Sequence, residues 1–156
     1  MNHRRLDLFL LISVVSLLIS SVSRAQYVVT NADDTLDPPG TLRWAIEQAN
    51  MDANASVITF QIDGGGSLAR IAVTGQLPVV TAPVTIDGWT QTGANCPPSV
   101  DVDGTAAVNA HGLWLNTTNC ILRGLIIHDF PRNGIFIASG GHHQIYGNYI
   151  GTDSGG

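Results

Sequence analysis

The sequence predicts an all-β fold in which short strands stack as a parallel β-helix, and three observations lead to this fold class. Short apolar segments separated by Gly, Asn, Pro and Asp fill the chain after Ala55. Two of these segments recur at a spacing of 22 to 23 residues. One amphipathic helix precedes them. Short strands alone fit a sandwich, a barrel or a solenoid, and the repeat favours the solenoid.

Residues 1–25 have the pattern of a secretory signal peptide. Arg4 and Arg5 precede a short apolar run, and Ser23-Arg24-Ala25 supplies a small-x-small cleavage site. The run is too short and too rich in serine for a membrane span. We expect cleavage after Ala25 and a secreted or cell-surface location, and an uncleaved anchor is the alternative.

The exported chain is expected to be acidic. Cleavage would remove Arg4, Arg5, Arg24 and Asp7 from the seven cations and twelve anions, and would leave four and eleven, a formal charge of −7. The sequence contains no lysine. Such a surface repels nucleic acid and anionic lipid, so neither is expected as a partner. Nothing in the pattern indicates a cofactor.

Residues 26–55 are predicted to form an N-terminal strand and a capping helix. The segment "QYVVTNADDT" begins as a strand, and "DPPG" ends regular structure. Leu42, Ala45, Ile46 and Ala49 then form one apolar stripe, with Thr41 as N-cap. The first coil of a solenoid would otherwise expose its apolar interior, so this helix is expected to cover it.

Residues 56–156 are predicted to form the coils of the β-helix. "HGLWL" aligns with "NGIFI" at a spacing of 22, and "ILRGLII" aligns with "QIYGNYI" at a spacing of 23. Earlier strands recur more loosely, from Ile58 to Ile86 and from Ile86 to Leu113. Alternation points one set of side chains into the core. This set comprises Val84, Ile86, Val100, Val102, Leu113, Leu115, Leu122, Ile127, Ile135, Ile137, Ile145 and Ile150.

No capping element follows Ile150 in the predicted pattern. The chain continues only as "GTDSGG". The last coil is therefore expected to be open, which would allow self-association through it.

Several segments together resemble secreted bacterial right-handed parallel β-helix proteins of the pectin-lyase-like superfamily. The resemblance rests on "LRWAIEQANMDANASVITFQI", "PVTIDGWTQTG", "HGLWL", "LRGLIIHDFPRNGI" and "GNYIGTDSGG". It implies a right-handed solenoid of about three to four coils. It also implies that longer relatives continue beyond "GTD", so the chain would be their N-terminal portion, truncated at its C-terminus. One departure is "TQTG", where the relatives have proline after Gln91.

Charged and histidine side chains give no predicted catalytic or metal site. The resemblance implies that lyases on this fold carry a carboxylate cluster beside a basic residue, and Asp87, Asp101, Asp103 and Arg123 are the candidates for such a set. Alternation places all four outward on strands, where we interpret them as ordinary solvated residues. The histidines that belong to turns in the predicted pattern, His111, His128, His142 and His143, are interpreted as solvated.

Trp114 and Phe136 are the predicted substrate-binding residues. Each lies between two inward aliphatic residues, so each should face outward, and their spacing of 22 places them on adjacent coils. An outward aromatic pair is a platform for a sugar ring or a partner protein. The alternative is that a loop, or the N-terminal strand Tyr27 to Thr30, covers the pair.

Two functional hypotheses follow. The first is an exported non-catalytic scaffold of the surface or adhesion type that contacts polysaccharide or a cell-surface partner. The second is a carbohydrate-active enzyme, such as a polysaccharide lyase or a glycoside hydrolase, with its active site on coils beyond this chain.

Cys96 and Cys120 leave open either one disulfide or two free thiols.

Overall fold

The computed structural model describes residues 24–63, 68–91 and 97–153, and this part of the chain is mostly β with little helix. The predicted signal peptide and Cys96 lie outside these residues, apart from Arg24 and Ala25. Within the described residues, the structure contains no helix with the length and hydropathy of a membrane span. The strands are β1 (Gln26–Val29), β2 (Ser56–Phe60), β3 (Ala69–Ala72), β4 (Val84–Asp87), β5 (Val100–Asp103), β6 (Leu113–Asn116), β7 (Ile121–Arg123), β8 (Leu125–His128), β9 (Ile135–Ser139), β10 (Gln144–Tyr146) and β11 (Tyr149–Ile150).

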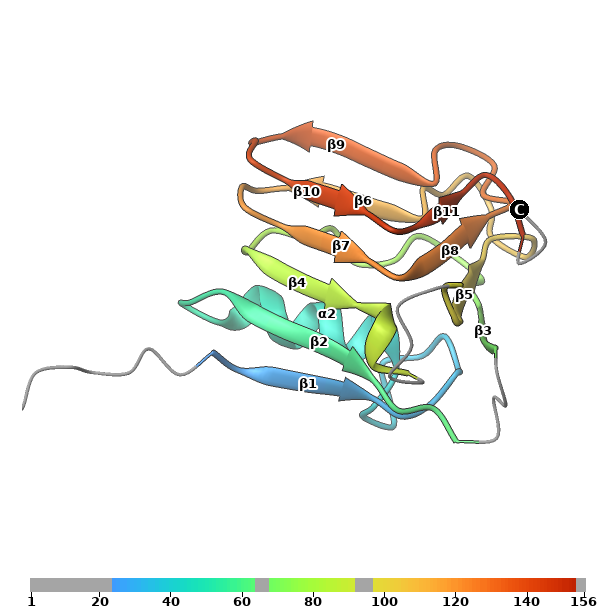
Figure 1. Ribbon diagram of the computed structural model, residues 1–156, viewed down its shortest axis with the longest axis horizontal. Coiled ribbons are helices and arrows are strands. Elements are labelled where there is room, and N and C mark those ends of the chain that lie inside the picture. The colour runs from blue at the N-terminus through green and yellow to red at the C-terminus, as the bar shows by residue number, and fades with distance from the viewer. Residues whose placement is uncertain (1–23, 64–67, 92–96, 154–156) are drawn as a thin grey trace, which may run out of the picture.

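The strands form three sheets, and every pairing between them is parallel. Sheet A has the order β1-β2-β4-β7-β10, sheet B the order β11-β8-β5-β3, and sheet C pairs β6 with β9. The chain visits sheets C, A and B with β6, β7 and β8, and again with β9, β10 and β11. Figure 1 shows these last three strands at the top of the molecule and β1 and β2 near its bottom.

The predicted repeat matches the observed strand register in its C-terminal half. Leu113 pairs with Ile135, Leu122 with Ile145, and Ile127 with Ile150. The looser spacing is right for Ile58, which pairs with Ile86. It is wrong for the next step, because Ile86 pairs with Leu122 in sheet A and not with Leu113 in sheet C. Strands β5 and β6 intervene in the chain and join other sheets, so the nearest aliphatic segment is not the partner.

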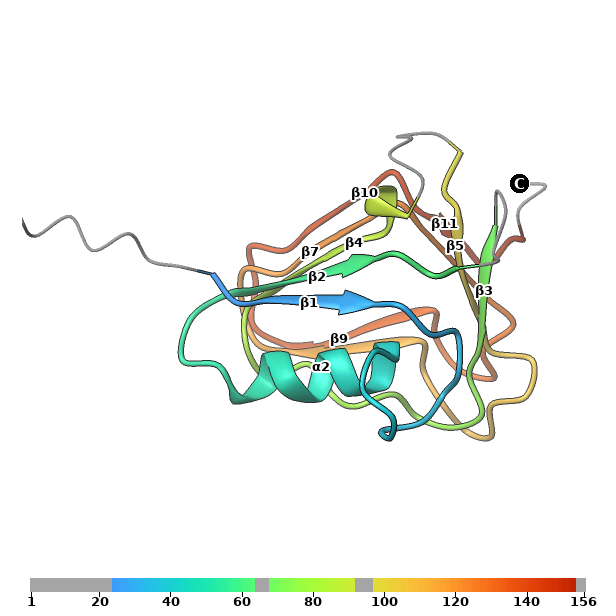
Figure 2. The ribbon, with the colours of Figure 1, turned by 90° about the horizontal axis from the view of Figure 1, so that it is seen from below.

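Helix α2 (Leu42–Met51) has the predicted apolar stripe and N-cap. Thr41 Oγ1 accepts a hydrogen bond from the Trp44 N–H at 3.1 Å, and Leu42, Ala45, Ile46 and Ala49 are buried. The helix packs against β1 and β2. Figure 2, seen from below, shows α2 running beside β1 at this end of the molecule.

The interior is a continuous aliphatic core that becomes exposed toward the last strands. The predicted inward residues of β4 to β8 are buried, including Ile86, Val102, Leu115 and Leu122 at 0 % exposure. The equivalent residues of β9 and β11 are not fully covered, and Ile137 is 48 % exposed. The prediction that all twelve line the core therefore fails at this end, because no further described strand pairs with β9, β10 or β11.

Candidate functional site

The predicted aromatic pair lies on sheet C. Trp114 pairs with Phe136 in the β6–β9 register, and the two ring centroids are 5.3 Å apart at an interplanar angle of 72°. Both side chains are partly exposed. Trp114 lies between the buried Leu113 and Leu115, as alternation predicts. The N-terminal strand does not cover the pair, because β1 pairs with β2 in sheet A.

His111 is the third member of this cluster, and sequence reasoning missed it. Its ring stacks on Phe136 at 4.5 Å between centroids and 13° between planes, and meets Trp114 edge-on at 5.4 Å. Gln76 fixes the backbone of His111, since the His111 N–H donates to Gln76 Oε1 and Gln76 Nε2 donates to the His111 carbonyl. His111 is only 6 % exposed, so its interpretation as a solvated turn residue was wrong.

Sheet B carries a cluster of charged side chains on its outward face. Asp101 and Asp103 come from β5, Arg70 from β3 and His128 from β8. Arg70 Nε donates to Asp103 Oδ2 at 3.0 Å. The two ring nitrogens of His128 lie 2.8 Å from Asp101 Oδ1 and 2.9 Å from Asp129 Oδ2.

This cluster corrects two sequence interpretations. Asp101 and Asp103 are 3 % and 5 % exposed, and His128 is 7 % exposed, so none is a solvated residue. His128 ends strand β8 and does not belong to a turn. A signal in the sequence could have shown that these residues lie together. Val102 pairs with Ile127 at a spacing of 25 residues, and the same spacing pairs Asp103 with His128.

Contacts within the sheet B cluster shift the pKa values of Asp103 and His128, and the hydrogen bond to Asp103 raises the pKa of Arg70. Burial opposes ionisation of Asp103, but hydrogen bonds from Thr105 and Arg70 outweigh it and lower the pKa to about 2. Burial also opposes protonation of His128, but its hydrogen bonds to Asp129 and Asp101 outweigh this effect and raise the pKa. Because a carboxylate only accepts, His128 donates to both partners only as the imidazolium.

The other two lyase candidates, Asp87 and Arg123, lie on sheet A. They form an ion pair between β4 and β7, and Arg123 Nη1 donates to Tyr146 Oη at 3.1 Å. The guanidinium lies over the Trp89 ring at 5.3 Å, which is a cation–π contact. The predicted set of Asp87, Asp101, Asp103 and Arg123 is therefore divided between two sheets. Asp87 is 7 % exposed and is likewise not solvated.

The remaining predicted turn residues are divided. His142 is exposed, whereas the Nδ1 of the half-buried His143 accepts from the Cys120 N–H at 3.2 Å. Cys120 carries a buried free thiol, and burial raises the pKa of this thiol.

Among the described residues, Asp103, His128 and Asp129 bring ligand-type atoms within 4.8 Å of one another. Both nitrogens of His128 already face carboxylates, so we assign no metal ligand here.

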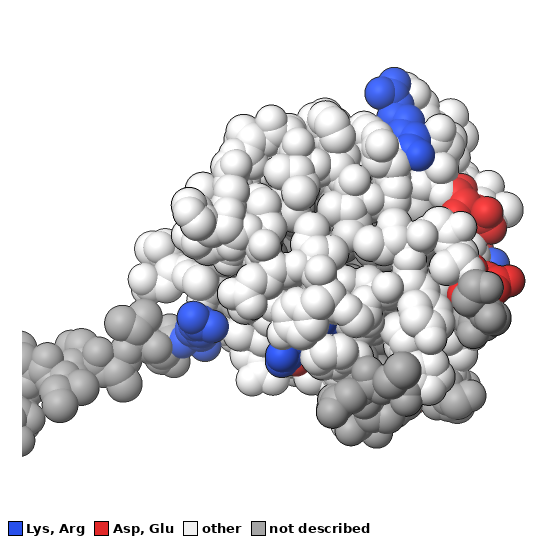
Figure 3. Space-filling view, turned by 45° about the horizontal axis from the view of Figure 1, so that its top comes forward, with Lys and Arg blue, Asp and Glu red and all other residues white. Residues whose placement is uncertain are grey.

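Charged side chains are few, because Asp, Glu, Lys and Arg make up only 12 % of the residues. Figure 3 shows a face that is mostly uncharged, with acidic side chains gathered at its right-hand edge.

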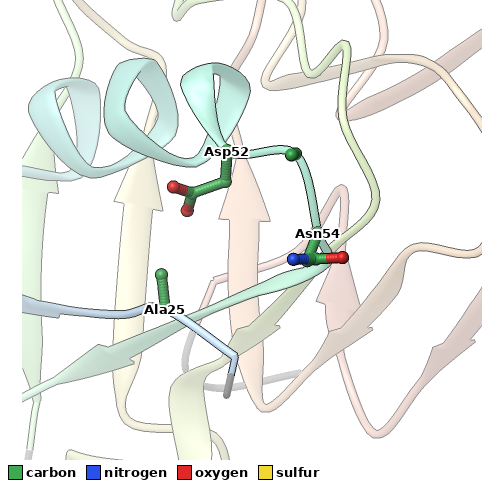
Figure 4. Close-up of a pocket in the computed structure, with 4 residues that line it drawn as sticks. Ala25, Asp52 and Asn54 are labelled. Atoms are coloured by element: carbon green, nitrogen blue, oxygen red, sulfur yellow. The ribbon is translucent and has the colours of Figure 1, made fainter. Parts of the chain in front are cut away.

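A small cavity of about 70 Å³ lies at the start of β1, lined by Ala25, Asp52, Ala53 and Asn54 (Figure 4). Asp52 there accepts from Tyr27 Oη at 2.9 Å and from Ser56, so it serves to join α2 to β1 and β2.

The chain matches no protein-family model, and no curated protein matches it.

Proposed function

We propose that the protein is an exported right-handed parallel β-helix, a non-catalytic scaffold that contacts carbohydrate through Trp114 and Phe136. The visits to sheets C, A and B by β6–β8 and again by β9–β11 support the coil architecture, as do the parallel pairings at 22 and 23 residues. In this architecture each strand set stacks on the last, and α2 covers the first.

The observation that carries the binding function is the partly exposed aromatic pair on adjacent strands. Apolar faces of sugar rings pack against aromatic rings, and an aromatic platform on a rigid sheet needs little reordering on binding. His111 supports Phe136 by stacking on it. The Nε1 of Trp114 is buried and has no hydrogen-bond partner among the described residues, so the indole ring offers chiefly its apolar surface.

The second candidate is a polysaccharide lyase-like enzyme, and the sheet B cluster is the observation that favours it. Asp101, Asp103 and His128 converge there with Arg70 on one outward face. A general base, however, needs an acceptor atom aimed at the substrate. Both nitrogens of His128 are hydrogen-bonded to carboxylates, and Asp103 accepts from Arg70 and Thr105. The scaffold is therefore the proposal that the geometry supports better.

Binding to a panel of soluble and insoluble polysaccharides tests the proposal. We expect Trp114→Leu and Phe136→Leu to lower the affinity for the retained polysaccharide by about tenfold or more, because each removes an aromatic face but keeps apolar volume. Tyr146→Leu is the matched control, since Tyr146 is an aromatic side chain on sheet A and 41 % exposed. Equal retention of all three variants and of the unaltered chain by the polysaccharide would contradict the proposal.

Incubation with the same polysaccharides distinguishes a lyase-like enzyme from a non-catalytic scaffold. Turnover to an unsaturated uronide, detected by ultraviolet absorbance, would contradict a non-catalytic scaffold. Its loss in Arg70→Ala and His128→Gln, with Trp114→Leu still active, would place the chemistry in the sheet B cluster.

A further inference from the structure

We propose that His111 contacts the bound sugar directly and determines which sugar the aromatic platform of Trp114 and Phe136 accepts. The Nε2–H of its ring donates to a hydroxyl oxygen of the sugar that lies on the platform. This inference rests on the proposed function, since it assigns a hydrogen-bonding contact to the same carbohydrate site. It defines the ligand as a glycan with a free hydroxyl group at the position that faces His111.

The two ring nitrogens of His111 differ in their surroundings. Nδ1 accepts from the Asn133 N–H at 3.4 Å, so a neutral ring carries its proton on Nε2. Nε2 has no hydrogen-bond partner among the described residues, and it is not one of their fully buried unpartnered atoms. The residue as a whole is only 6 % exposed. The polar atom that this buried side chain brings to the surface is therefore an unused donor.

An unused donor in such a side chain indicates a ligand. Nearly all buried polar groups of folded proteins have a hydrogen-bond partner, and a phenylalanine could stack on Phe136 without bringing a nitrogen. A pyranose that stacks on an aromatic face carries hydroxyl groups around its periphery, and their oxygens accept hydrogen bonds. The indole nitrogen cannot donate to them, because Trp114 Nε1 is fully buried. Within the cluster of these three rings, His111 therefore supplies the accessible donor.

The His111 ring lies close enough to the platform for one sugar to touch both. Its centroid is 4.5 Å from that of Phe136 and 5.4 Å from that of Trp114. Strand β6, which follows His111 and carries Trp114, has neighbours on both sides, because it pairs with β9 and Leu115 bridges Val80. The surface around Trp114 is therefore the outward face of sheet C and not a strand edge.

The backbone of His111 is held in place by contacts that reach back to α2. Its N–H and its carbonyl both bond to the Gln76 side chain, at 2.9 and 3.1 Å. The Gln76 carbonyl in turn accepts from Arg43 Nη1 at 2.7 Å, and Arg43 is paired with Asp34. A donor fixed in this way needs little reordering when a sugar binds. The same rigidity makes the donor selective, because a sugar without the matching hydroxyl leaves it unpaired.

NMR titrations test the proposal, with the methyl glycoside of the sugar that makes up the retained polysaccharide and with each of its monodeoxy derivatives. We expect the unaltered chain to bind one derivative about tenfold more weakly than the parent glycoside, because that derivative lacks the oxygen that accepts from His111. His111→Phe keeps a stacking ring and removes the donor, so it should bind the parent and this derivative equally. Trp114→Phe keeps a smaller aromatic face, so it should weaken the binding of both and preserve their ratio.

His142→Asn is the control, because it removes an exposed imidazole from a residue with φ of 60°, a conformation that asparagine tolerates. It should bind every glycoside as the unaltered chain does. The imidazole nitrogen resonances of the unaltered chain give a second measurement that needs no variant. The Nε2 resonance of His111 should shift with the parent glycoside and should shift less with the weakly bound derivative.

Equal binding of all the derivatives by the unaltered chain would overturn the proposal, as would discrimination that persists in His111→Phe. In either case, polysaccharide retention that is lost in Trp114→Leu would still support the aromatic platform. A chain that retains no polysaccharide would overturn the proposed function, and the role of His111 with it.

Discussion

At the residue scale, the turns after the strands depend on glycines in the left-handed region. Gly140 follows β9 with φ +90°, and a Cβ built on it would overlap the carbonyl group of Thr117 on the neighbouring turn. Its neighbour Gly141 has no positive φ, and a Cβ there would meet nothing within 4 Å. Two adjacent glycines therefore have opposite tolerance for a side chain.

Gly140→Ala is expected to lower the free energy of unfolding by about 2 kcal/mol or more, because strain at positive φ adds to the overlap with Thr117. Gly141→Ala should change it by less than about 0.5 kcal/mol. Urea unfolding of the two variants measures the difference. Similar losses in both would mean that the turn relaxes as a unit.

At the element scale, α2 is held by burial and by its ends. Four apolar residues face β1 and β2, and Thr41 caps the first turn. Arg43 also ties the helix to the chain on both sides, through an ion pair with Asp34 and a hydrogen bond to the Gln76 carbonyl at 2.7 Å. The helix therefore closes the core at the end opposite to β9, β10 and β11.

Ile46→Ala tests this role of the helix. Ile46 is 1 % exposed, so the substitution should cost about 3 kcal/mol through lost burial and a cavity. Glu47→Ala, at the next and exposed position, should cost less than about 0.5 kcal/mol. Thermal unfolding of both variants compares them, and equal melting temperatures would contradict a closing role for α2.

At the scale of the whole molecule, stability should depend on pH through the sheet B cluster. The pKa of Asp103 is lowered from 3.8 to about 2, so its contribution is present above pH 4 and is lost as the pH falls toward 2. That shift corresponds to about 2 kcal/mol. The pKa of His128 is raised from 6.5, so its contribution is present below pH 6.5 and is lost as the pH rises through the raised value.

The urea midpoint of the unaltered chain is therefore expected to fall as the pH is raised from 6.5 through the raised pKa of His128. His128→Gln should flatten this fall, because a glutamine amide does not titrate. His142→Gln is the control, since His142 is exposed. A fall that persists unchanged in His128→Gln would assign it to another group.

The order of the residues was enough to predict the local pattern of strands and helix. Period-two alternation placed Leu113, Leu115 and Leu122 inward, the 22- and 23-residue repeat gave the register of the last strands, and the apolar stripe gave α2. These features depend on neighbours along the chain or on one repeat length, so they can be seen in the residue order. Alternation and the 22-residue repeat also predicted that Trp114 and Phe136 lie beside each other on adjacent strands.

Which outward side chains meet could be seen only once the strands were assembled into sheets. Connections of unequal length separate β2, β4 and β7, so Ile86 pairs with Leu122 and Arg123 meets Asp87 rather than Asp101 or Asp103. Arg70, His111 and His128 gained their partners through the same packing of distant strands. Alternation points these side chains outward, yet the assembled sheets bury them as pairs. Desolvation and partner charges therefore shift their pKa values only in the folded protein.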